Sequence, residues 1–236
     1  MTGITPLSQV AHRGLRYDRH AAGGTRRFAR IGLSEIAVAA ADMPLCLAKD
    51  GQTGRFNLIA LVSLVEPANL FVFGGGFQAT YVPRAVMLGG FRLDARGAVG
   101  LAVDPADPSL GDAGVPLFAG EQPTPLSHDI ARALERLVAD VEGAQALVDA
   151  WAAHGLIRPL GLSLSQADGG AHDLAGLYTI DEAAVQALPD ADLIALHRAD
   201  RLAPAAVLTA SLAQVERLRQ LHNARFAPAL TGYSLD

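Results

Sequence analysis

The spacing of apolar residues changes near the middle of the chain, and this change limits the folds that are open to it. Before residue 127, short apolar runs are separated by glycine, proline and aspartate, a pattern typical of strands and turns. After Ser127, apolar residues recur at helical spacing as far as Trp151. Strands followed by helices, without regular β-α alternation, predict an α+β fold and not a doubly wound sheet.

The first half is predicted to be β-rich and built from antiparallel hairpins. Ser34 is placed to cap a short helix over 35–41. Asp50-Gly51 is a turn signal between two strands, and three consecutive glycines at 74–76 mark a second turn that needs positive φ. The strands expected, in chain order, are 43–48, 56–65, 69–73, 77–82, 86–93 and 98–103.

A long amphipathic helix is predicted over 128–154, with Ser127 as its N-cap and Gly155 just beyond its end. Trp151 continues the apolar stripe of this helix, so we expect it on the buried face. That stripe comprises Leu134, Leu137, Val138, Val141 and Val148. After the helix, a second hairpin (160–165 and 174–180) is expected around the turn signal Asp168-Gly169-Gly170. Short C-terminal helices are expected over 181–188, 191–199 and 212–223, with breaks at 189–190 and 201–204.

Charge and linker signals indicate how the chain is organised. Residues 1–34 carry six Arg against one Asp, whereas 94–146 carry nine Asp or Glu against three Arg. We expect a basic N-terminal arm (1–33), a single α+β domain (34–226) and a C-terminal tail (227–236). The arm is expected to pack against the acidic region of its own fold or of a partner subunit, which leaves a homo-oligomer open.

Composition excludes several classes of protein. The net charge of −5 argues against nucleic-acid binding. No apolar run approaches the ~20 residues of a spanning helix, so no transmembrane segment is expected. The first 30 residues lack the apolar region of a secretory signal, which predicts a cytoplasmic location. The lone Cys46 lies in an apolar stretch and is expected to be a buried hydrophobe.

No catalytic residue, metal ligand or cofactor motif stands out. The glycines at 74–76 lack the Lys-Ser/Thr of a phosphate loop, and the seven histidines lack metal-ligand spacing. A ligand-binding rim is the hypothesis that remains, because a strand ending in Tyr81 and Pro83 would present Arg84 to a carboxylate, beside Asn69. A structural hydrogen bond of the Tyr81 hydroxyl and a solvated Arg84 are the alternative.

A family resemblance runs over residues 12–224. The sequence resembles the SapC family of bacterial proteins in the order and spacing of Met43-Pro44-Leu45, Ala60-Leu61, Leu64, Asn69-Leu70-Phe71-Val72, Tyr81-Val82-Pro83, Phe91, Val103-Asp104, Gly114-x-Pro116-Leu117-Phe118, Gly176-Leu177-Tyr178 and Ser211-Leu212. It departs from the family where Phe77 replaces a usual Trp and where 86–90 replaces an Arg-rich stretch.

The resemblance implies an association with bacterial surface-layer or TonB-dependent nutrient-uptake systems, near flavin-dependent halogenase-like enzymes. It implies no established reaction. We therefore expect a non-catalytic accessory protein that binds a peptide, a small molecule or a partner enzyme. The alternative is an enzyme that modifies a small molecule or peptide with a metal or cofactor, at a site assembled from distant residues.

Overall fold

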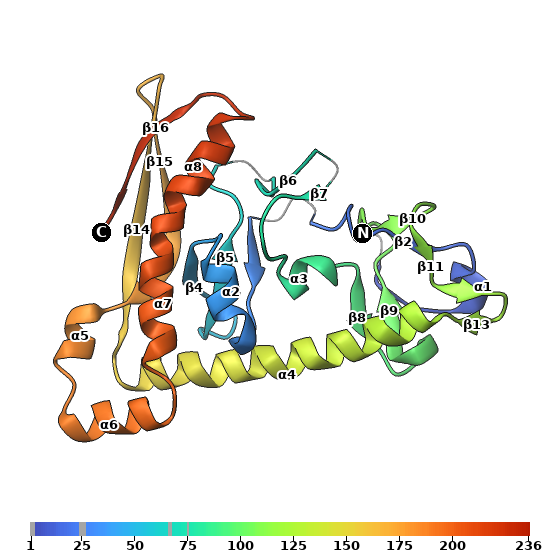
Figure 1. Cartoon of the computed structure of the whole chain (residues 1–236), viewed down its shortest axis with the longest axis horizontal. Coiled ribbons are helices and arrows are strands. Elements are labelled where there is room, and N and C mark those ends of the chain that lie inside the picture. Colours follow the sequence, from blue (N-terminus) through green and yellow to red (C-terminus); the bar gives the residue numbers. More distant parts are fainter. Residues whose placement is uncertain (1–2, 24–26, 66–67, 75) are drawn as a thin grey trace. The chain divides into compact units, whose positions relative to one another are not determined.

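A computed structural model describes residues 3–23, 27–65, 68–74 and 76–236 of the chain (Figure 1). The backbone forms two compact units. Unit 1 contains the described residues of Met1–Thr25, Val72–Gln78 and Val82–Asp140, and unit 2 those of Arg26–Phe71, Ala79–Tyr81 and Val141–Asp236. Antiparallel sheets and helices occur together, which confirms the predicted α+β class.

A six-stranded antiparallel sheet is the framework of unit 2 (Figure 1). Its strand order is β16-β14-β15-β4-β5-β3. The strands are β3 (Phe28–Arg30), β4 (Leu45–Lys49), β5 (Phe56–Leu61), β14 (Ile157–Gln166), β15 (Ala171–Ile180) and β16 (Leu230–Leu235). The central hairpin β14-β15 turns at Gly169, whose φ of 86° suits glycine, as the Asp-Gly-Gly signal predicted.

Unit 2 also contains helices. They include η1 (Leu33–Glu35), α2 (Ile36–Ala40), α5 (Glu182–Gln186), α6 (Asp190–Arg198), α7 (Ala203–Ser211), η3 (Leu212–Gln214) and α8 (Val215–Asn223). Of these, α2, α7 and α8 contact strands of this sheet. Helix α7 packs against β15 and β4, while α2 packs on α7. The Ser211 hydroxyl accepts a hydrogen bond from the Leu45 amide at 2.8 Å, which fixes the end of α7 to the start of β4.

Unit 1 is built from short strands around Tyr17 and Phe91, whose rings meet edge to face at 5.3 Å. Its sheets have the orders β1-β9-β8, β10-β2-β11, β12-β13 and β6-β7. The elements are β1 (Thr5–Pro6), α1 (Gln9–His12), β2 (Arg16–Tyr17), β6 (Val72–Phe73), β7 (Gly76–Phe77), α3 (Arg84–Met87), β8 (Phe91–Leu93), η2 (Ala98–Gly100), β9 (Leu101–Val103), β10 (Leu110–Gly111), β11 (Val115–Pro116), β12 (Phe118–Ala119) and β13 (Gln122–Pro123).

Helix α4 (Pro125–Ala153) confirms the predicted long helix but begins earlier than expected. Pro125 starts it, because the fixed φ and missing N–H of proline suit the first helical position. Ser127 is therefore not the N-cap, and its hydroxyl donates to the Leu117 carbonyl at 2.7 Å. The part of α4 up to Asp140 belongs to unit 1 and the remainder to unit 2. Gly155 ends the helix with a φ of 68°, as predicted.

Several predicted strands are wrong or shorter than expected. The expected strand 86–93 is instead α3 followed by β8, because Pro83 opens a helical turn at Arg84. The hairpin around residues 74–76 is reduced to β6 and β7, and Gly75 lies outside the described residues. Helix α7 begins inside the expected break at 201–204, with Pro204 in its first turn, and occupies a stretch for which no helix was predicted. The expected arm contributes β1, α1, β2 and β3, and the expected tail contains β16.

Candidate functional site

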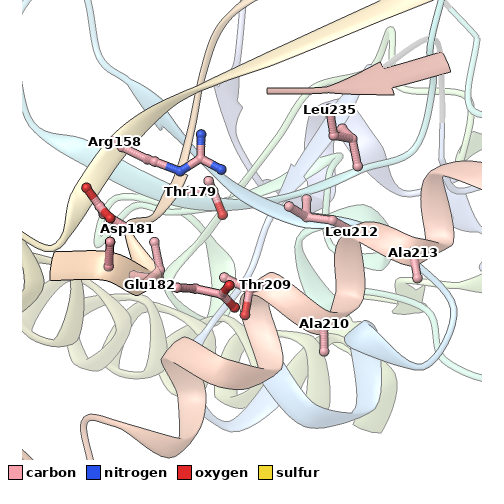
Figure 2. A pocket seen from close by; sticks show the side chains of 11 residues that line it. Arg158, Thr179, Asp181, Glu182, Thr209, Ala210, Leu212, Ala213 and Leu235 are labelled. Carbon is pink, nitrogen blue, oxygen red and sulfur yellow. The ribbon is translucent and has the colours of Figure 1, made fainter. Parts of the chain in front are cut away.

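A groove of about 510 Å³ lies at one end of the six-stranded sheet in unit 2 (Figure 2). The end of β15 forms its floor, α5 forms one wall, and α7 with η3 forms the other. A second hollow of about 390 Å³ shares Ile180, Glu182 and Thr209 with the first and extends between α5 and α7. Both volumes fall in the range of ~300–1,000 Å³ that is usual for small-molecule sites.

The register of the β14-β15 hairpin places two polar side chains on the groove side. Arg158 of β14 lies directly opposite Thr179 of β15. Residues that face each other across antiparallel strands project from the same side of the sheet. The next pair on that side is Leu160 and Leu177, both buried. Arg158 and Thr179 therefore lie at the boundary between the apolar core of the sheet and the groove.

A β-bulge sets this register. Between the pairs Leu160–Leu177 and Leu162–Leu174, β14 has one residue and β15 has two, Ala175 and Gly176. Gly176 has a φ of 79°, a conformation that glycine adopts without steric cost. Without the extra residue, Tyr178 would lie opposite Arg158, and Thr179 would project from the other side of the sheet.

The Thr179 hydroxyl is the most informative atom of the groove. Thr179 is 1% exposed, yet among the described residues nothing forms a hydrogen bond with its Oγ1 atom. Leaving a buried hydroxyl unsatisfied costs about 1–3 kcal/mol, so native structures seldom keep one without a reason. Figure 2 shows this hydroxyl between Arg158 and Glu182 in the lining of the groove.

Charged groups of both signs surround Thr179. Arg158 is exposed, and its guanidinium donates to the Pro159 carbonyl at 3.3 Å, a long contact that uses one of its five N–H donors. Asp181 uses one carboxylate oxygen to cap α5, accepting from the Ala184 amide at 3.0 Å. The Glu182 side chain extends from α5 toward α7 (Figure 2). Thr209 donates to the Ala206 carbonyl at 3.1 Å, so its hydroxyl keeps acceptor capacity.

The second hollow is mainly apolar. Small and aliphatic side chains from α5, from α7 and from the residue before α7 line it: Val185, Leu202, Ala205 and Ala206. The loop that leads into α7 is held in place because Trp151 Nε1 donates to the Arg201 carbonyl at 2.8 Å. The whole groove thus combines a polar end of mixed charge with an apolar trough.

The structure places Asn69 and Tyr81 in unit 2 and gives the Asn69 Oδ1 and the Tyr81 hydroxyl protein partners, while the buried Asn69 Nδ2 has no hydrogen-bond partner among the described residues. Asn69 is 2% exposed, and its Oδ1 accepts from the Phe71 amide at 3.0 Å. The Tyr81 hydroxyl donates to the buried carboxylate of Glu35 at 2.6 Å. This bond fits the structural role that the sequence left open for Tyr81.

Arg84 opens α3 in unit 1 and forms an ion pair with Asp140 there. The two side chains are 24% and 15% exposed, so the pair is largely shielded from water. Arg84 is therefore more than a solvated side chain. Ligand binding by Asn69, Tyr81 and Arg84 stays a prediction.

The residues that line the groove were not singled out from the sequence. Arg158, Thr179, Glu182 and Thr209 carry no motif and are brought together by the sheet register and by helix packing. Elsewhere, no group of three or more His, Cys, Asp or Glu side chains within the described residues is arranged to hold a metal ion. Cys46 is fully buried, and burial raises the pKa of its thiol. No described helix combines the length and apolarity needed to cross a bilayer.

Comparison with known proteins gives one finding. The family model described as SapC matches residues 7–218 of the chain. No curated protein and no solved structure shows a significant match. The matched region contains most of the groove, including Gly176, whose positive φ permits the bulge beneath Thr179.

Proposed function

Because the chain belongs to the SapC family, we propose that it is a non-catalytic accessory protein that binds a small molecule or peptide in the groove between β15, α5 and α7. The observation that carries the proposal is the buried Thr179 hydroxyl, which has no hydrogen-bond partner among the described residues and lines this groove. A ligand that supplied this bond would remove the cost of burying it.

The biological setting of the proposal comes from the family resemblance. The protein would work in the cytoplasm, with surface-layer or TonB-dependent nutrient-uptake systems. In that setting a non-catalytic protein would hold its ligand for a partner enzyme or carrier. The groove suits this role, because its open polar end leaves a bound molecule accessible while the apolar trough retains it.

A native mass spectrum of the protein purified from bacterial cells tests the proposal. Ala206 is exposed and lines the apolar trough, so Ala206→Trp should fill the trough without disturbing the core. We expect a small-molecule adduct on the parent and its loss from Ala206→Trp. Ala152→Trp is the matched control, since Ala152 is an exposed helical alanine of α4 outside the groove lining, and it should keep the adduct.

Two results would contradict the proposal. One is an adduct that Ala206→Trp retains, which would place the ligand elsewhere. The other is a parent protein that carries no adduct. Elemental analysis of the same sample adds a second reading, because about one equivalent of iron or zinc would favour the enzyme alternative.

A further inference from the structure

The geometry points to a zwitterion with an apolar side chain, either a free α-amino acid or a short peptide, as the occupant of the groove. This inference rests on the proposed function, since it names the chemical class of the ligand at the same site. It follows from three features of the described residues. These are the sign and order of the charges, the unsatisfied hydroxyl between them, and the apolar trough beside them.

The polar part of the groove carries charges of both signs. Arg158 stands at one end of the polar part of the groove, and the Glu182 carboxylate lies on the other side of Thr179, toward α7 (Figure 2). A guanidinium holds a carboxylate through two parallel hydrogen bonds, and a carboxylate is the natural partner of an ammonium group. A ligand of one sign would be attracted by one end and repelled by the other. A molecule that carries both charges satisfies both ends.

The Thr179 hydroxyl lies between these charges and can both donate and accept a hydrogen bond. An amino acid or peptide offers a carboxylate, an amide or an ammonium group at a matching position. A purely apolar ligand would leave Thr179 unsatisfied, so the hydroxyl selects against it. The bulge at Gly176 gives Thr179 this position, which makes Gly176 a positioning residue for the site.

The apolar trough accounts for the side chain of the ligand. Val185, Leu202 and Ala205 line it, and Glu182 and Thr209 lie where it joins the polar part of the groove. A branched aliphatic side chain would bury its surface there while its backbone charges stay at the polar end. Leucine and leucyl-leucine are therefore suitable probes.

Isothermal titration calorimetry of the full chain tests the inference. The probes are leucine, leucyl-leucine, N-acetyl-leucyl-leucine and leucyl-leucinamide. We expect leucine or leucyl-leucine to bind, and each capped dipeptide to bind about tenfold more weakly than the uncapped one, a difference of about 1.4 kcal/mol. Whichever of leucine and leucyl-leucine binds with the higher affinity shows whether the site takes a single amino acid or a peptide.

Two variants assign the charges to residues. Arg158→Gln should bind leucyl-leucine and its amide equally, because the partner of the carboxylate is gone. Glu182→Gln should bind leucyl-leucine and its acetylated form equally. Arg198→Gln and Glu142→Gln change exposed residues outside the groove and should keep both preferences. Matching thermal midpoints show that the variants are folded.

Three outcomes would overturn the inference. The first is equal binding of capped and uncapped dipeptides by the parent. The second is a charge preference that survives in both variants. The third is an absence of binding by any probe, while the adduct sensitive to Ala206→Trp is still present. That third result would reject the ligand class and leave the binding function intact, whereas an adduct insensitive to Ala206→Trp would reject the binding function itself.

Discussion

Trp151→Ala should lower the free energy of unfolding by about 3–5 kcal/mol, the usual cost of removing a large aromatic side chain from a packed core. Trp151 is 0% exposed, and its indole Nε1 donates to the Arg201 carbonyl at 2.8 Å. The substitution creates a cavity and also releases the loop that leads into α7. Denaturant unfolding followed by circular dichroism measures the effect. Iodide should leave the native fluorescence of the parent unquenched, since Trp151 is its single tryptophan.

Val138→Ala is the control on the same helix. Val138 is 44% exposed, so its truncation should change stability by no more than about 0.5 kcal/mol. An unchanged unfolding midpoint for Trp151→Ala, or ready quenching of the parent by iodide, would show that the helix presents a different face to the core.

Asp42→Ala should destabilise the protein by about 1–3 kcal/mol for each buried donor that it leaves without an acceptor. Asp42 is 2% exposed and pairs with Arg217. Its other carboxylate oxygen accepts from the Thr80 amide at 2.7 Å, from the Tyr81 amide at 3.3 Å and from the Thr80 hydroxyl. Asp149→Ala is the matched control, since the Arg55–Asp149 pair is 57% and 48% exposed and should contribute at most about 1 kcal/mol.

The contribution of Asp42 should depend on pH. Burial acts to raise its pKa, but the hydrogen bonds from Thr80 and Tyr81 and the charge of Arg217 outweigh it, so the pKa is lowered from its usual 3.8. A lowered folded-state pKa stabilises the protein fully above the unfolded value, and this stabilisation is lost as the pH falls through the folded value. The difference in free energy of unfolding between parent and Asp42→Ala should therefore be constant near pH 6 and shrink as the pH falls below 3.8. If this difference in free energy of unfolding grew as the pH fell, the pKa of Asp42 would not be lowered in the folded protein.

The parts of the fold that rest on local chemistry could be predicted from the sequence. The Asp-Gly-Gly turn fixed the β14-β15 hairpin, and the helical period of apolar residues located α4 and placed Trp151 in the core. Val138 shows the limit of that argument, because it lies on the expected stripe yet is exposed. The spacing of apolar residues along a 29-residue helix does not determine which neighbouring elements cover each part of it.

The candidate groove could not be predicted, because its geometry depends on non-local events. Counting outward from the turn would pair Arg158 with Tyr178, and only the bulge at Gly176 puts Thr179 there instead. The opposite wall is α7. The sequence did not predict this helix, because Pro204 in its first turn indicated a break. Gly176 belongs to a Gly-Leu-Tyr motif of the sequence, but its positive φ is apparent only in the folded hairpin.

Electron density in the groove would test the binding site most directly. A crystal structure of the protein purified from bacterial cells should show a bound molecule between β15, α5 and α7. One of its polar atoms should lie about 2.7–3.2 Å from Thr179 Oγ1, the range of an ordinary hydrogen bond. A groove that holds only water, with the Thr179 hydroxyl bonded to the protein's own backbone, would contradict the account.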